Sequence, residues 1–184
     1  MTAARSTRYI RARATDMLRA HGIYSAPVPI DEIARRLGAE IHYVPYEGEL
    51  AGMLIRQHGR TIIGVNNAHH RNRKRFTIAH ELGHLVLHDL EIHIDHNFKV
   101  RRDSKSSVAL IHKRDGVSSL AIDPLEIEAN RFAAEILMPF DMIRMDLESA
   151  NFDYENIEEV KPLARRYVVS PQAMLHRIAN IGHM

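Results

Sequence analysis

The sequence predicts a single α+β domain in which a small sheet precedes a central helix, with helical segments at both ends. Three observations support this prediction. Short strand-like runs cluster between residues 39 and 66, and a helical segment with three histidines follows at 75–88. Helix start and stop signals then mark the remainder of the chain. We expect N-terminal helices in 1–38, the sheet and core in 39–138, and a C-terminal helical subdomain in 139–184.

Composition limits the classes of protein that fit. The 184 residues are 45% hydrophobic, which is enough for one core of ordinary size. A net charge of +2 argues against binding polyanions through bulk charge. The chain has no cysteine, which excludes disulfides and thiolate metal ligands. It shows neither a secretion signal nor an apolar run of 18 residues, so we expect a cytoplasmic protein without membrane contact.

The first 38 residues predict two helices. From Tyr9 to His21, one face collects Ile10, Ala14, Met17 and Leu18. Five arginines lie in or near this helix, and we interpret them as a solvated face rather than a site for an acidic or nucleic-acid partner: Arg5, Arg8, Arg11, Arg13 and Arg19. A second helix runs from Ile30 to Leu37 and ends at Gly38.

Three strands are expected next, at residues 39–46, 53–57 and 61–66, with a turn at His58-Gly59 between the last two. They predict a small, mostly antiparallel sheet. An exposed edge of such a sheet can pair with extended peptide, although the sequence does not say which strand would do so.

The central helix carries His80-Glu81-Leu82-Gly83-His84, the H-E-x-x-H pattern. Residues four apart lie about one turn apart on the same helix face, so His80 and His84 can direct two imidazoles at one metal ion. Glu81 is rotated by about 100° from His80 and can accept a proton from water beside that metal. Gly83 is a poor helix former, which indicates that another element packs closely against it.

A third ligand is needed downstream. A metzincin would place glycine and histidine where this chain has Leu87 and Leu90, so that class is excluded. The better candidate is a helix that starts after Asp123, where Glu126 is more favoured than Glu128 to face inward. Glu126 also occupies the position that completes a capping box, so ligand and cap both remain open.

Several nearby polar residues receive weaker interpretations. His88 is one turn beyond His84, and we expect it to support or pack against the site, because three ligands on consecutive turns cannot reach one ion. Asp89 is the fallback third ligand. His69 and His70 are expected to be solvated. Residues 97–119 form a basic segment that is either a lid beside the cleft or a plain connection.

The C-terminal segment predicts a helix, a turn and a second helix, in which Ser170 is the cap and Pro171 the first residue. Such a helix-turn-helix-like ending can bind DNA. Here the second helix offers only Gln172, His176 and Arg177 as base readers, and acidic residues precede it. We therefore expect it to pack against the core, and we do not expect direct nucleic-acid binding.

Two long motifs resemble the ImmA/IrrE family of zinc metallopeptidases. They are Arg-Phe-Thr-Ile-Ala-His-Glu-Leu-Gly-His-Leu-Val-Leu-His at residues 75–88 and Glu-Ile-Glu-Ala-Asn-Arg-Phe-Ala-Ala-Glu-Ile-Leu-Met-Pro at 126–139. The resemblance extends over roughly residues 10–182. It implies a zincin-like fold and Zn²⁺ as the metal. It also implies that Glu126, the first glutamate of Glu-x-x-Ala-Asn, is the third ligand beside His80 and His84.

The resemblance also implies an activity, the cleavage of a helix-turn-helix transcriptional repressor that derepresses a mobile-element or stress-response operon. Glu81 would be the catalytic base and the repressor the protein partner. The alternative is a non-catalytic metal-binding module that holds a repressor or a toxin–antitoxin partner. An intact Glu81 favours the peptidase.

Overall fold

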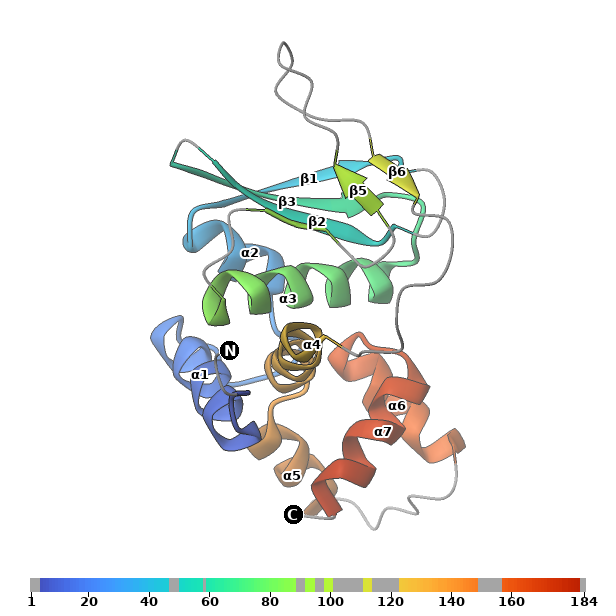
Figure 1. Ribbon diagram of the computed structural model, residues 1–184. Helices are drawn as coiled ribbons and strands as arrows, with labels where there is room; N and C mark the ends of the chain where they lie inside the picture. Colours follow the sequence, from blue (N-terminus) through green and yellow to red (C-terminus); the bar gives the residue numbers. More distant parts are fainter. Residues whose placement is uncertain are drawn as a thin grey trace.

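The computed structural model describes residues 4–46, 50–57, 59–88, 92–94, 98–100, 111–113, 123–148 and 157–182. The long helix α3 (Arg71–Leu87) lies between a β-sheet on one side and a group of helices on the other (Figure 1). Among the described residues, no helix is both long and apolar enough to cross a membrane.

The N-terminal helices form where the sequence predicts them. Helix α1 (Thr7–Ala20) begins after Ser6, whose hydroxyl accepts a hydrogen bond from the backbone N–H of Tyr9 at 3.2 Å. Its buried side is formed by Ile10, Ala14 and Leu18. Helix α2 (Ile30–Arg36) is followed by Gly38 at φ 84°, a left-handed conformation that favours glycine.

The prediction that the N-terminal arginines form a solvated face is wrong for two of them. Arg5 pairs with the buried carboxylate of Glu128 at 2.9 Å. Arg11 approaches Glu135 at 3.4 Å, and its guanidinium lies 4.2 Å from the centre of the Phe140 ring. Their partners follow more than 120 residues later, so local charge patterning could not reveal them.

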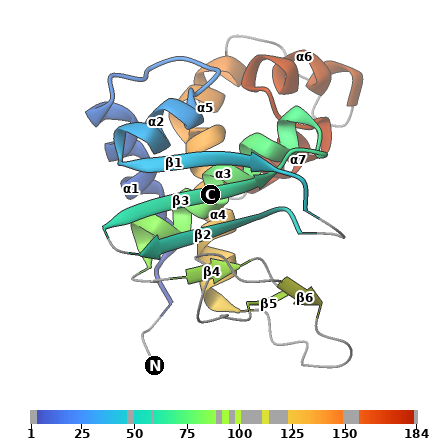
Figure 2. The ribbon, with the colours of Figure 1, turned by 90° about the horizontal axis from the view of Figure 1, so that it is seen from above.

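The main sheet has the strand order β1-β3-β2-β4, formed by β1 (Ala39–Val44), β2 (Gly52–Gln57), β3 (Arg60–Asn66) and β4 (Ile92–Ile94). It lies across α3 (Figure 2). Strand β2 pairs antiparallel with both β3 and β4, whereas β1 pairs parallel with β3. The sheet is therefore mostly antiparallel, as predicted, with β4 as an unpredicted fourth strand. Gly59, at φ 75°, lies in the β2–β3 turn.

Part of the segment interpreted as a basic loop is regular structure. Strand β5 (Phe98–Val100) pairs antiparallel with β6 (Ile111–Lys113) in a separate two-stranded sheet. The rest of residues 97–119 lies outside the described residues, and so do the side chains of β4, β5 and β6. The choice between a lid beside the cleft and a plain connection is thus not tested.

Four helices complete the chain: α4 (Pro124–Leu137), α5 (Phe140–Glu148), α6 (Ile157–Tyr167) and α7 (Pro171–Gly182). The Asp123 carboxylate caps α4 by accepting from the N–H of Leu125 at 2.9 Å. Ser170 caps α7 by accepting from the N–H of Ala173 at 3.1 Å. As expected, α7 packs on the core: Arg177 is buried and donates to Glu135 and to the carbonyl of Met138, so it does not face solvent as a base reader.

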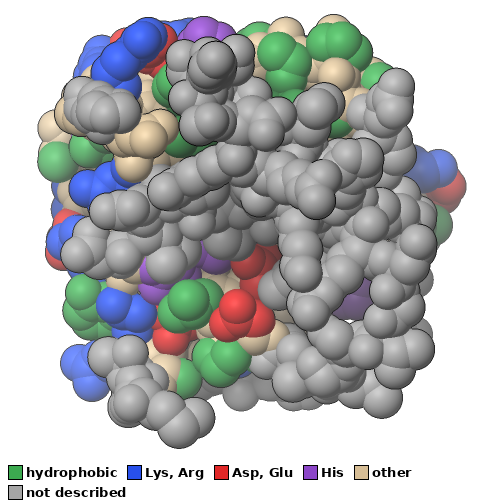
Figure 3. Space-filling view, turned by 45° about the horizontal axis from the view of Figure 1, so that its top comes forward, with side chains coloured by type: hydrophobic (Ala, Val, Ile, Leu, Met, Phe, Trp, Pro, Cys, Tyr) green, Lys and Arg blue, Asp and Glu red, His purple; other side chains and the backbone are tan. Residues whose placement is uncertain are grey.

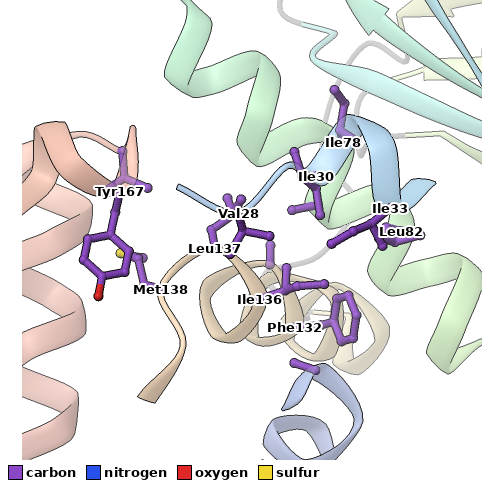
Figure 4. Packing of buried hydrophobic residues seen from close by; sticks show 14 of the residues in the cluster. Val28, Ile30, Ile33, Ile78, Leu82, Phe132, Ile136, Leu137, Met138 and Tyr167 are labelled. Atoms are coloured by element: carbon purple, nitrogen blue, oxygen red, sulfur yellow. The ribbon is translucent and has the colours of Figure 1, made fainter. Parts of the chain in front are cut away.

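The core lies where α2, α3 and α4 meet (Figure 4). Ile78 and Leu82 of α3 pack with Ile33 of α2 and with Phe132 and Ile136 of α4, and all five are at most 1% exposed. Burial of side chains of this size contributes about 1.5–3 kcal/mol each. This packing fixes α3 against α4, and the candidate site lies along the same contact.

Candidate metal centre

Helices α3 and α4 approach each other closely at Gly83. A Cβ atom at this position would lie 3.1 Å from both the Cα and the carbonyl oxygen of Ala129, and 3.3 Å from the Cβ of Phe132. The prediction that an element packs closely against Gly83 is therefore confirmed. The short distance between the helices allows side chains of α4 to reach the histidines of α3.

Three buried side chains converge at this contact: His80 and His84 from α3 and Glu126 from α4. The Nε2 atoms of the two histidines are 3.1 Å apart. One Glu126 oxygen lies 3.3 Å from His80 Nε2, and the other lies 3.2 Å from His84 Nε2. Figure 3 shows histidine and acidic side chains adjoining one another near the middle of the face in view. The close approach of α3 and α4 thus brings together His80, His84 and Glu126, the three residues predicted as metal ligands.

The donor set and its spacing fit a divalent metal ion. Tetrahedral zinc with bonds of 2.0–2.1 Å to histidine nitrogen and carboxylate oxygen requires ligand atoms about 3.3 Å apart. The two Nε2 atoms, 3.1 Å apart, are close to this spacing. His80 Nε2 lies 3.3 Å from one Glu126 oxygen, and His84 Nε2 lies 3.2 Å from the other. Two imidazoles and one carboxylate also leave a fourth position for water or substrate, as catalytic zinc sites do. The cluster therefore gathers the donor types that suit a divalent metal ion within 4.8 Å of one another.

His80 is oriented by Asn130, whose Oδ1 lies 3.0 Å from His80 Nδ1. An amide oxygen only accepts, so Nδ1 carries the proton and Nε2 keeps its lone pair for a metal. Burial alone would lower the pKa of His80, but the carboxylates of Glu126 and Glu81 outweigh it and leave this pKa raised. In the metal-free protein, these carboxylates thus favour the protonated form of His80.

His84 is oriented by a different partner. Helix α3 ends at Leu87, and the extended backbone of His88 allows its ring to turn back, with Nδ1 3.0 Å from His84 Nδ1. The Nε2 of His88 lies 3.1 Å from the Glu128 carboxylate. His88 therefore supports the cluster, as predicted. We expected Glu126 rather than Glu128 to face inward, but Glu128 is also buried, with only 3% of its surface exposed. Both are buried because other elements cover α4 on both flanks.

Glu81 is 1% exposed and follows His80 directly on α3. Gly52 of β2 makes room for it: a Cβ on Gly52 would overlap the Thr77 methyl group and lie 3.3 Å from Glu81 Oε1. A side chain on Gly52 would therefore push the sheet away from α3 at the level of the carboxylate. Glycine at this strand position keeps the sheet packed over Glu81.

The structure also gives the surroundings of other histidines and tyrosines whose side chains could bear on the site. His70 caps α3 by accepting from the N–H of Asn72 at 3.3 Å, and burial lowers the pKa of His69. The Tyr167 hydroxyl donates to Asp146 at 2.7 Å among the C-terminal helices. Tyr46 is linked to the site electrostatically, because burial and the nearby Glu81 charge raise its pKa to about 12. Asp89 lies outside the described residues.

Sequence reasoning missed Asn130 as the partner of His80, and it considered Glu128 only as an alternative to Glu126, not as the partner of His88. Asn130 follows Glu126 by four positions, so a helix places both on one face toward the histidines, and this spacing could have revealed it. Glu128 shares no helix face with Glu126, and its partner Arg5 lies 123 residues away. No sequence pattern indicates that contact.

Comparisons with known proteins were made against families, curated proteins and solved structures. Residues 34–179 match the family model described as IrrE N-terminal-like domain, which is a peptidase family. No curated protein matches the chain. A solved structure described as a Mycobacterium tuberculosis transcriptional regulator has a similar fold, with a TM-score of 0.57 at 15% identity. The similarity covers 93% of this chain but only 46% of that one, so this chain spans about half the length of the regulator.

Proposed function

Because this chain belongs to the ImmA/IrrE family of metallopeptidases, with IrrE N-terminal-like sequence over residues 34–179, we propose that it is a zinc-dependent endopeptidase. The observation that carries the proposal is the buried cluster of His80, His84 and Glu126, whose ligand atoms all lie within 4.8 Å of one another. These residues would hold the metal. Zinc is the metal best suited to two imidazoles and a carboxylate in tetrahedral arrangement.

Glu81 is the proposed general base. A zinc ion held by the cluster would supply Lewis acidity toward a water molecule and a peptide carbonyl. The Glu81 carboxylate would take a proton from that water and return it to the amine that leaves when the peptide bond breaks. Its burial beneath β2 limits access of bulk water to this proton. Asn130 and His88 would keep the two histidine rings aimed at the metal.

The proposed substrate is a helix-turn-helix transcriptional repressor, whose cleavage would derepress a mobile-element or stress-response operon. Membership of the family supports a protein substrate, and the similar fold of a protein described as a transcriptional regulator is consistent with a regulatory role. A repressor substrate would also require this protein to act in the cytoplasm, where repressors bind DNA.

Metal content tests the ligand set. Untagged protein purified without chelator should contain about one zinc per chain by elemental analysis, as a three-ligand site predicts. Glu126→Ala should lose that zinc, whereas Asp123→Ala, which removes only the helix cap, should retain it. Zinc retained in Glu126→Ala would contradict the proposed third ligand. A wild-type protein that takes up no metal would favour the non-catalytic partner module instead.

Terminal proteomics tests the activity even while the substrate is unidentified. Wild-type protein and the Glu81→Gln variant, both loaded with zinc, would each be incubated with a lysate of the source organism. New protein N-termini that require Glu81 and map to a transcriptional repressor would support the proposal. Identical sets of N-termini from the wild type and from Glu81→Gln would contradict the proposed peptidase activity.

A further inference from the structure

A chain of buried and partly buried polar contacts connects the cluster to the segment before α1. It runs from His84 to His88, then to Glu128, and ends at Arg5, which is contributed by the N-terminal segment. Arg5 lies outside residues 34–179, the part of the chain that the family model matches. Figure 1 shows α1 beside α4, which places this segment next to the helix that carries Glu128.

Arg5 binds both oxygens of the Glu128 carboxylate. Its backbone N–H donates to Oε1 at 2.6 Å, and its guanidinium Nη1 donates to Oε2 at 2.9 Å. The Glu128 side chain is 3% exposed and that of Arg5 is 31% exposed, so water competes little for the carboxylate. Because both atoms that face Arg5 must be acceptors, a carboxylate fits this position, whereas an amide does not.

This carboxylate determines which nitrogen of His88 carries a proton. Glu128 Oε2 lies 3.1 Å from His88 Nε2 and can only accept, so Nε2 of His88 is protonated. In a neutral ring, Nδ1 of His88 is then an acceptor. It lies 3.0 Å from Nδ1 of His84, which must therefore donate. His84 consequently keeps the lone pair on Nε2, the atom that faces His80 and Glu126.

We propose that Arg5 and Glu128 are positioning residues that, through His88, set the tautomer and the ring orientation of His84 for metal binding. The inference rests on the proposed role of His84 as a ligand. It gives the N-terminal segment a part in building the metal centre, so that a change at residue 5 acts on metal affinity through two intervening side chains.

The Glu128→Gln variant makes the proposal testable. Glutamine cannot accept at both positions. With its amide oxygen in the place of Oε1, bound to the backbone N–H of Arg5, it presents N–H in the place of Oε2, toward both His88 Nε2 and the Arg5 guanidinium. His88 then carries its proton on Nδ1, and His84 is driven to the tautomer protonated at Nε2. Loss of such a supporting contact typically lowers metal affinity by about 10-fold or more. Arg5→Gln removes one of the two contacts to the carboxylate and should give a smaller loss in the same direction.

Arg11→Gln is the matched control. Arg11 also joins α1 to a buried glutamate of α4, but this glutamate, Glu135, is bound by Arg177 of α7 rather than by a histidine of the cluster. The variant therefore reports the effect of loosening α1 alone. Zinc affinity would be measured by competition with a chromophoric chelator, and the unfolding midpoint of each metal-free variant would be determined in parallel.

The expected result is that Glu128→Gln and Arg5→Gln bind zinc more weakly than Arg11→Gln, in that order of severity. Equal affinity in all three variants, when wild type binds zinc, would overturn the inference while leaving the proposed function intact. Long-range ¹H–¹⁵N NMR of the metal-free wild type provides a readout that needs no metal. A proton on Nδ1 of His84 and on Nε2 of His88 is expected, and the opposite tautomers would also overturn the inference.

Discussion

Gly83 of α3 lies directly against Ala129 of α4, so closely that a Cβ on Gly83 would be only 3.1 Å from two backbone atoms of Ala129. This contact sets the distance between the helix that carries both histidines and the helix that carries Glu126. Because His84 Nε2 and the nearest Glu126 oxygen are only 3.2 Å apart, a shift of a few tenths of an ångström between the helices would alter the cluster.

Gly83→Ala should therefore weaken metal binding more than it weakens the fold. Alanine improves helix propensity by about 1 kcal/mol. Its methyl group, however, would meet backbone atoms at 3.1 Å, and overpacking of this kind costs about 1–3 kcal/mol. The two effects partly cancel in the unfolding free energy, but the helices still move apart. Zinc competition and urea unfolding of the metal-free protein would measure both quantities, and wild-type zinc affinity would contradict the expectation.

Glu81→Gln should abolish cleavage and keep the metal. The substitution preserves size but removes the carboxylate that would accept the proton, and general-base catalysis typically contributes about 10²–10⁴-fold. Elemental analysis and cleavage of a substrate identified by terminal proteomics would measure the two properties on one sample. Normal cleavage by the variant would show that another group accepts the proton.

Zinc affinity and the stability of the metal-free protein should depend on pH in opposite directions. The pKa of His80 is raised above its usual value of 6.5 in the folded, metal-free protein. Protonation of His80 therefore stabilises the metal-free fold fully below pH 6.5, and this contribution is lost as the pH rises through the raised pKa. Zinc requires neutral His80, so its affinity should fall as the pH is lowered through the same pKa.

Competition titrations and thermal unfolding of the metal-free protein, both between about pH 5 and 8, would measure these dependences. The variant His80→Gln is the control, because it removes the titrating group. A wild-type stability profile of the same shape as that of His80→Gln would show that His80 does not contribute to the pH dependence.

Arg177→Ala should strongly destabilise the protein. Its guanidinium makes two hydrogen bonds to Glu135, at 2.9 and 2.5 Å, and both side chains are nearly inaccessible. Removing Arg177 leaves the buried carboxylate of Glu135 without its main cationic partner. Loss of one partner of a buried ion pair lowers the unfolding free energy by about 3–5 kcal/mol. The exposed Arg144–Glu148 pair is the control, and Arg144→Ala should change the unfolding free energy by less than about 1 kcal/mol. If urea unfolding gave similar losses of unfolding free energy for Arg177→Ala and Arg144→Ala, the stabilising role of the Arg177–Glu135 pair would be contradicted.

The helices and the histidine pair could be predicted because local rules specify them. Asp123 caps α4, Ser170 caps α7, and the four-residue spacing of His80 and His84 places both rings on one helix face. Hydrophobic periodicity likewise identified the buried side of α1. These features depend on residues within one or two turns of each other, so the sequence carries them directly.

Three other features were decided by the tertiary structure. Strand β1 pairs parallel with β3, although the sequence signals only the β2–β3 turn. Arg5 reaches Glu128 across 123 residues, so local charge patterning wrongly assigns Arg5 to a solvated face. Glu126 and Glu128 of α4 are both buried because α4 is enclosed between α3 and α1, so helix periodicity alone could not assign Glu126 to the metal cluster and Glu128 to His88.

By itself, the sequence determined the reactive groups of this protein and the helix faces that present them, because backbone geometry repeats every few residues whatever the fold. Only the tertiary structure decided which groups meet. That choice depends on how closely α3 and α4 pack at Gly83 and on which distant side chains are buried together, and these follow from packing of the whole core rather than from any local pattern.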